Sequence, residues 1–88
     1  MKALQQLKSG GYKVQIHHVR NIMTNKGLEL VDSRDITLMD EIYARGGKTI
    51  VIVTTPSKKV FMGVALCHPN DNYSKKEGII QALKKVFA

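Results

Sequence analysis

Residues 48–67 read KTIVIVTTPSKKVFMGVALC, which is two apolar segments separated by a short, partly basic connection. The four consecutive aliphatic residues 50–53 make both faces of the first segment apolar, as is typical of a central strand. The connection begins at Pro56, and the second segment alternates larger side chains on one face with smaller ones on the other. We therefore predict a β-hairpin with strands over 48–55 and 60–67, and it is the firmest structural prediction in the chain.

A helix is predicted after the hairpin and the loop 68–72. Ser74 and Glu77 have the spacing of a capping box, in which the hydroxyl and the carboxylate each bond a free backbone amide. The expected core face of this helix consists of the apolar residues at helical spacing, Ile79, Ile80, Leu83, Val86 and Phe87. Glycine weakens a strand, so Gly63 predicts either a bulge or the close approach of another backbone.

The N-terminal half contains shorter patterns. The predictions are a helix over 1–8 ended by Gly10 and Gly11, a strand from Tyr12 to Arg20, a connection over 21–27, a short strand or edge over 28–31, and a helix over 37–43 capped by Thr37 and Asp40. Together they predict one α+β domain over 1–88, in which 48–88 form a β-hairpin plus helix unit. The sheet is expected to be three- or four-stranded and mainly antiparallel, with a basic C-terminal helix packed on one face.

Charge is unevenly distributed along the chain. The 14 Lys and Arg residues exceed the 7 Asp and Glu residues, for a net charge of +7. Residues 48–88 hold seven basic and two acidic residues (7 − 2 = +5), whereas 29–41 hold the five remaining acids with only Arg34 to oppose them. A basic structured unit favours binding to a polyanion, although the same lysines would also serve solubility.

Nucleic acid is the polyanion that this pattern predicts, through contacts to the phosphate backbone. With only three arginines in the chain, bidentate reading of bases is disfavoured. The expected contact residues are Lys58, Lys59, Lys75, Lys76, Lys84, Lys85 and Arg20. The alternative is a protein-binding inhibitor of a host or bacterial defence complex, which docks through Asp35, Asp40 and Glu41 or through the basic helix. Acids near helix starts also complement the helix dipole, and this simpler explanation of the acidic segment stays open.

Catalytic and metal chemistry are not expected. His17, His18, Cys67 and His68 are zinc-compatible types, but neighbours on a strand point to opposite faces, so neither adjacent pair supplies two ligands easily. Cys67 is predicted to be a buried, inert thiol. Residues 46–49, GGKT, lack the earlier glycine of a nucleotide-binding loop and enter a strand where that motif opens a helix. We therefore expect no enzyme activity, no cofactor and no metal.

The predicted compartment is the reducing cytoplasm. One cysteine cannot form an internal disulfide, and no apolar stretch approaches the roughly 20 residues that span a bilayer. The N-terminal segment also lacks the continuous apolar core of a signal peptide. Because a chain of 88 residues is only marginally stable alone, a homodimer is compatible with the sequence.

Two resemblances add to these predictions. Residues 74–78, SKKEG, resemble the C-terminal part of a double-stranded RNA-binding domain, whose last helix begins with lysines on phosphates across the groove. The chain departs from that family at Gly78 and Ile79, where another basic residue is expected. Residues 63–78, with 18–20 and 46–49, are similar to small uncharacterised proteins encoded by tailed phages. That similarity implies an accessory role in infected bacteria and supports both the nucleic-acid and the inhibitor hypotheses.

Overall fold

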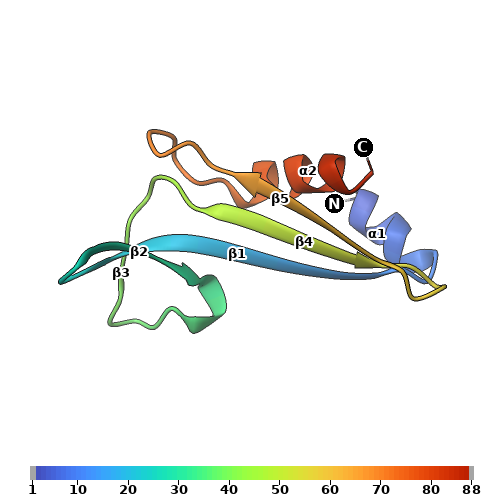
Figure 1. Ribbon diagram of the computed structural model, residues 1–88, viewed down its shortest axis with the longest axis horizontal. Coiled ribbons are helices and arrows are strands. Elements are labelled where there is room, and N and C mark those ends of the chain that lie inside the picture. Colours follow the sequence, from blue (N-terminus) through green and yellow to red (C-terminus); the bar gives the residue numbers. More distant parts are fainter. Residues whose placement is uncertain (1, 88) are drawn as a thin grey trace.

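The protein has an α+β fold, in which one antiparallel sheet carries both α-helices on the same side (Figure 1). The computed structural model describes residues 2–87, apart from the side chain of residue 3. The elements in chain order are α1 (Lys2–Ser9), β1 (Lys13–Thr24), β2 (Gly27–Asp32), the 3₁₀ turn η1 (Ser33–Asp35), β3 (Glu41–Ile42), β4 (Lys48–Thr54), β5 (Val60–Leu66) and α2 (Lys75–Val86). The predicted fold class is confirmed.

The sheet has the strand order β2-β1-β4-β5, with the short β3 also paired to β1. The strand β1 is 12 residues long and changes partners along its length. Its first half pairs with β4, from Lys13 opposite Thr54 to Val19 opposite Lys48. Its second half pairs with β2 on one side and with β3 on the other. Residues 19–32 therefore project beyond the helix-covered part of the sheet, and we call this hairpin the arm.

The core lies between the sheet and α2, which crosses β4 and β5. Its fully or nearly fully buried residues are Val51, Val53, Ala65, Ala82 and Leu83. A Cβ atom at Gly63 would overlap the carbonyl oxygen of Ala82, so the backbone of α2 lies directly on β5 at this point. Of the two explanations predicted for Gly63, the close approach of another backbone is the one observed.

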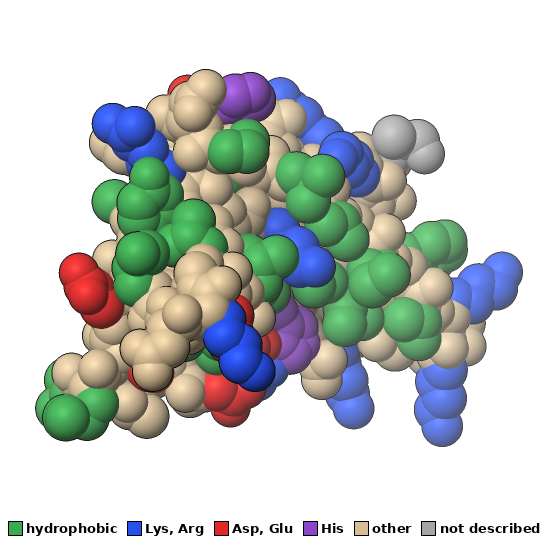
Figure 2. Space-filling model, turned by 60° about the vertical axis from the view of Figure 1, so that its left-hand side comes forward, with side chains coloured by type: hydrophobic (Ala, Val, Ile, Leu, Met, Phe, Trp, Pro, Cys, Tyr) green, Lys and Arg blue, Asp and Glu red, His purple; other side chains and the backbone are tan. Residues whose placement is uncertain are grey.

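The opposite side of the sheet is open, because neither helix covers it. Paired residues of adjacent strands point to the same side, and alternate residues point to opposite sides. Since Val51 and Gly63 face α2, their neighbours Ile52 and Met62 face the open side. Figure 2 shows hydrophobic side chains in several groups on one face of the molecule, with lysine and arginine side chains both among them and around them.

Several predicted elements are confirmed. The hairpin of β4 and β5, the helix α2, the N-terminal helix and the strand β1 all form, and β4 is central as expected. The short strand expected over 28–31 is β2. The connection expected over 21–27 is wrong at its start, because β1 continues to Thr24 and the turn is confined to residues 25 and 26.

The helix predicted over 37–43 is wrong. The capping contact does form, since the carboxylate of Asp40 accepts a hydrogen bond from the Thr37 N–H at 2.8 Å. The chain then leaves the turn as β3, and the Tyr43 N–H donates to the carbonyl of Asn21 at 2.9 Å. A helix of seven residues gains too few internal hydrogen bonds to compete with pairing to β1.

The details of α2 also differ from the prediction. The hydroxyl of Ser74 accepts a hydrogen bond from the Glu77 N–H, as expected of an N-cap. The carboxylate of Glu77 does not accept a hydrogen bond from the Ser74 backbone N–H, as a complete capping box requires. It accepts instead from Gln81 Nε2 at 2.7 Å, one turn along the helix. Ala82 is fully buried although it was not on the predicted core face, whereas Phe87 is 60% exposed.

Candidate nucleic-acid interface

A network of hydrogen bonds around Tyr73 fixes the chain just before α2. The Tyr73 hydroxyl lies 2.7 Å from His18 Nδ1 and 2.6 Å from the hydroxyl of Thr49, and it donates to the carbonyl of Lys48 at 3.2 Å. Thr49 is fully buried, and burial raises the pKa of Tyr73. The network therefore ties the start of α2 to the centre of β1 and to the beginning of β4.

Arg20 lies on the ring of Tyr73, with its guanidinium carbon 4.5 Å from the ring centre. Its Nε atom is buried and has no hydrogen-bond partner among the described residues. Lys75, at the first turn of α2, lies on the same side of the sheet. Burial and then the positive charges of Lys75 and Arg20 lower the pKa of His18, which shows that both cations lie close to it.

Arg20 and Lys75 line one shallow depression of about 500 Å³. The rest of its wall comes from the segment after β2 and from β3, namely Ser33, Ile36, Thr37, Leu38 and Ile42. Among the described residues no carboxylate lines it, although the Thr37 hydroxyl in its wall donates to the carboxylate of Asp40 at 3.3 Å. A wall with two cations and the hydroxyl group of Ser33 is suited to an anion such as a phosphate group.

The lysines of α2 lie near both of its ends. Lys75 and Lys76 lie in its first turn, and Lys84 and Lys85 lie in its last turn. The Nζ of Lys85 donates to the carbonyl of Val64 on β5 at 2.7 Å.

Lys58 and Lys59 lie in the turn between β4 and β5, where Lys58 has a positive φ of 67°. They are exposed, like the four lysines of α2. Both ion pairs found among the described residues involve Asp32, so none of the seven predicted contact residues is paired with an acid there.

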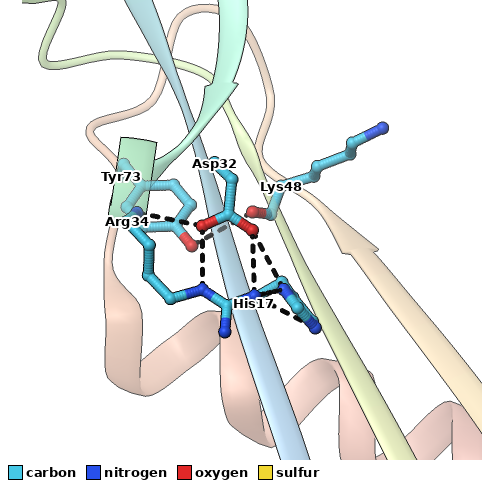
Figure 3. Close-up of polar contacts among 5 residues, drawn as sticks. All are labelled: His17, Asp32, Arg34, Lys48 and Tyr73. Atoms are coloured by element: carbon cyan, nitrogen blue, oxygen red, sulfur yellow. Dashed lines mark hydrogen bonds and ion pairs between the residues drawn. The ribbon is translucent and has the colours of Figure 1, made fainter. Parts of the chain in front are cut away.

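Two acids of the acidic segment are engaged in local hydrogen bonds. The carboxylate of Asp32 accepts hydrogen bonds from the Arg34 backbone N–H and side chain and lies 2.9 Å from His17 Nδ1 (Figure 3). These hydrogen bonds, first that of the Arg34 backbone, hold the pKa of Asp32 well below its usual range. The Asp40 carboxylate accepts a hydrogen bond from the Thr37 N–H within its own turn. Asp35 and Glu41 are therefore the exposed acids of the predicted docking set.

No group of three or more His, Cys, Asp or Glu side chains is placed to hold a metal within residues 2–87. The thiol of Cys67 is half-buried and lies 3.4 Å from the carbonyl of Asp71, in the loop before α2. Cys67 thus follows β5 instead of lying within it, which corrects its predicted place on a strand.

Sequence reasoning missed Tyr73 and Thr49. Nothing in their local pattern marks them, because the contacts join residues 24 positions apart. Arg20 was predicted as a contact residue, but its proximity to Lys75 depends on the pairing of β1 with β4 and on the crossing of α2 over that sheet.

Comparisons with protein-family models, with curated proteins and with solved structures find no match to this chain. In the part of the chain that is described, no helix is long and apolar enough to cross a membrane.

Proposed function

We propose that this protein binds nucleic acid through the phosphate backbone, with the depression between Arg20 and Lys75 as its main anion site. The observation that carries the proposal is that these two cations line one depression and that neither forms an ion pair with an acid among the described residues. The tailed-phage similarity makes the cytoplasm of an infected bacterium the proposed setting. Enzyme activity and a cofactor form no part of the proposal.

The spacing of the lysines suits a strand that runs along α2. Lys76 and Lys84 are eight residues apart, which is about 12 Å along the helix axis, and they lie near one line on its surface. That distance corresponds to roughly three to four base-pair steps at about 3.4 Å each. One nucleic-acid strand can therefore contact both ends of α2, and RNA duplexes are the first ligands to try because of the resemblance at residues 74–78.

The test is a fluorescence anisotropy titration with single-stranded and double-stranded DNA and RNA of one length, at two salt concentrations. Lys75→Glu is expected to weaken binding by at least about 10-fold and to reduce the salt slope by about 1. The matched control is Lys26→Glu, which makes the same charge change on an exposed lysine at the tip of the arm. Equal losses for the two variants, or no binding at low salt, would contradict the proposal.

His18 provides a second readout that reports on the depression itself. Because the cations Lys75 and Arg20 contribute to its lowered pKa, a phosphate that screens them will raise it. We expect NMR titration to give a higher pKa for His18 with a saturating oligonucleotide than without it. An unchanged His18 pKa in the bound protein would place the phosphates elsewhere.

A second candidate function is protein binding through the segment 35–41, as in an inhibitor of a host or defence complex. The observation that favours it is that Leu38 and Met39, between the acids, are almost fully exposed, at 105% and 93%. The test is rescue of phage growth in bacteria that carry a nucleic-acid-guided defence system. Replacing Leu38 and Met39 by Ser, with Asp35 and Glu41 replaced by Ala, should abolish rescue, and undiminished rescue would exclude this segment.

A further inference from the structure

The open side of the sheet carries an apolar surface that the fold leaves uncovered. Its most exposed side chains on β5 are Val60 at 63%, Met62 at 64% and Leu66 at 75%, and Leu30 on the arm is 54% exposed. Between them lie Ile50 and Ile52 of β4, which are half-buried. We call this set the open face.

The strand β4 has aliphatic residues on both of its faces, as in a strand that is buried on both sides. Val51 and Val53 are fully buried beneath α2, and Ile50 and Ile52 alternate with them on the open face. A strand with aliphatic residues on both faces is typical of a sheet covered on both sides, yet the monomer covers only one. Contiguous apolar surface of this extent usually marks an interaction site.

The unpaired edge of β5 is partly blocked against pairing with a strand of another chain. Lys85 donates its hydrogen bond to the Val64 carbonyl, which occupies a backbone acceptor on that edge. A lysine at a sheet edge is a common device against strand addition. Strand addition at that edge is therefore disfavoured, whereas the face of the sheet stays uncovered.

The open face contains both a projection and a hollow, so it can fit a copy of itself. Val60 and Met62 project near one end of β5. At the other end a hollow of about 520 Å³ lies between the arm and β5, with Leu30, Leu66 and the side-chain-free Gly46 and Gly47 in its wall. A two-fold axis between these features would place the projection of each copy over the hollow of the other, as an isologous contact requires.

The available area agrees with a weak dimer. The strands β1, β4 and β5, paired over seven residues, measure about 23 Å by about 15 Å. Two such faces would bury roughly 700 Å² in total before the arm is counted, which is the size of a weak interface.

We propose that the protein forms a homodimer by packing two open faces against each other, with α2 of each copy on the outside. The basic residues of α2 then stay accessible, so this inference is independent of the proposed nucleic-acid function. Aligned packing of two sheets about 10 Å apart is the expected geometry.

The test is sedimentation equilibrium from low micromolar to several hundred micromolar protein, with Met62→Glu as the interface variant. Met62 is largely exposed in the monomer, so the variant should fold, and circular dichroism will verify this. The matched control is Met39→Glu, which places the same change on a 93% exposed methionine outside the open face. We expect wild type and Met39→Glu to dimerise, and Met62→Glu to raise the dimer Kd by at least about 10-fold.

A mixed-label NMR sample locates the interface independently. Intermolecular contacts between the methyl group of Met62 in one copy and those of Leu30 or Leu66 in the other are expected. A wild-type monomer at every concentration would overturn the proposal and leave the open face for a different partner. A dimer that persists in folded Met62→Glu would also overturn it.

Discussion

Gly63 and Gly78 determine how closely α2 approaches the sheet. A Cβ atom at Gly63 would overlap the carbonyl of Ala82, and one at Gly78 would overlap the hydroxyl of Thr49. Neither glycine has a positive φ, so both are required by space and not by backbone conformation. At Gly63 the backbone of β5 lies against the backbone of α2, and at Gly78 the backbone of α2 lies against the side chain of Thr49.

Gly78→Ala provides a test in which two effects oppose each other. Alanine inside a helix usually stabilises by about 1 kcal/mol relative to glycine. Here the overlap with Thr49 outweighs that gain, and we expect the free energy of unfolding to fall by about 1–3 kcal/mol in urea denaturation. Gly10→Ala is the control, because its Cβ would make only ordinary contacts at 3.5 Å or more. A more stable Gly78→Ala variant would show that α2 does not approach Thr49 this closely.

The lowered pKa of Asp32 predicts how the stability of the protein depends on pH in the acidic range. The hydrogen bonds from Arg34 and His17 lower its pKa in the folded protein, so the unfolded chain binds its proton more readily. The contribution of Asp32 is therefore fully present above its unfolded pKa of about 4 and is lost as the pH falls towards the folded pKa. We expect the unfolding free energy of Asp32→Asn to change less than that of wild type between about pH 5 and pH 2. Asp35→Asn, outside this cluster, should retain the wild-type slope, and equal slopes for all three proteins would contradict the prediction.

At the scale of elements, α2 depends on one half of its predicted capping box. The Ser74 hydroxyl accepts the Glu77 N–H, whereas the Glu77 carboxylate contacts only Gln81 within the helix. Ser74→Ala is therefore expected to cost about 1 kcal/mol in thermal or urea unfolding. Glu77→Ala should cost less than about 0.5 kcal/mol, and a larger loss than for Ser74→Ala would mean that the complete box forms in solution.

The arm and β4 are expected to differ most in local stability. Four of the six residues of β2 are exposed, and the arm lies beyond the part of the sheet that α2 covers. β4 lies between β1 and β5, with Val51 and Val53 fully buried. Native-state hydrogen exchange should therefore be fastest in the amides of β2 and slowest at Val51 and Val53. Comparable protection in the two strands would show that something covers the arm.

At the scale of the whole molecule, the arm makes the protein long for its size. The radius of gyration of the Cα atoms is 14.3 Å, and the molecule measures 45 × 23 × 20 Å. A compact domain of 88 residues would have a radius of about 12 Å. The extended shape leaves a small core on one side of the sheet and a large uncovered surface on the other.

This shape predicts that thermal stability depends on protein concentration. Association through the open face, as proposed above, would stabilise the folded state by mass action, so the wild-type Tm is expected to rise by a few degrees for each tenfold increase in concentration. Differential scanning calorimetry will measure this effect. Met62→Glu should have a Tm that is independent of concentration, and a concentration-independent Tm for wild type would contradict association.

Local patterns in the chain predicted most of the elements. The β4 and β5 hairpin, α1, α2 and the start of β1 follow from hydrophobic periodicity and from turn and cap residues, which act within a few positions. The helix over 37–43 failed because pairing of β3 with β1 joins residues about 20 positions apart. No local signal reports such a contact.

For the candidate site, the sequence favoured a class of ligand but did not indicate which cations meet. The excess of lysine and the presence of Arg20 are properties of composition, and they favour phosphate groups wherever the residues lie. The convergence of Arg20 with Lys75 follows from how β1, β4 and α2 pack. Likewise, the aliphatic run 50–53 predicts two apolar faces for β4, but the placement of both helices on one side leaves the other face open. Composition and periodicity act locally, whereas a binding surface requires side chains from distant segments to meet, which only long-range packing brings about.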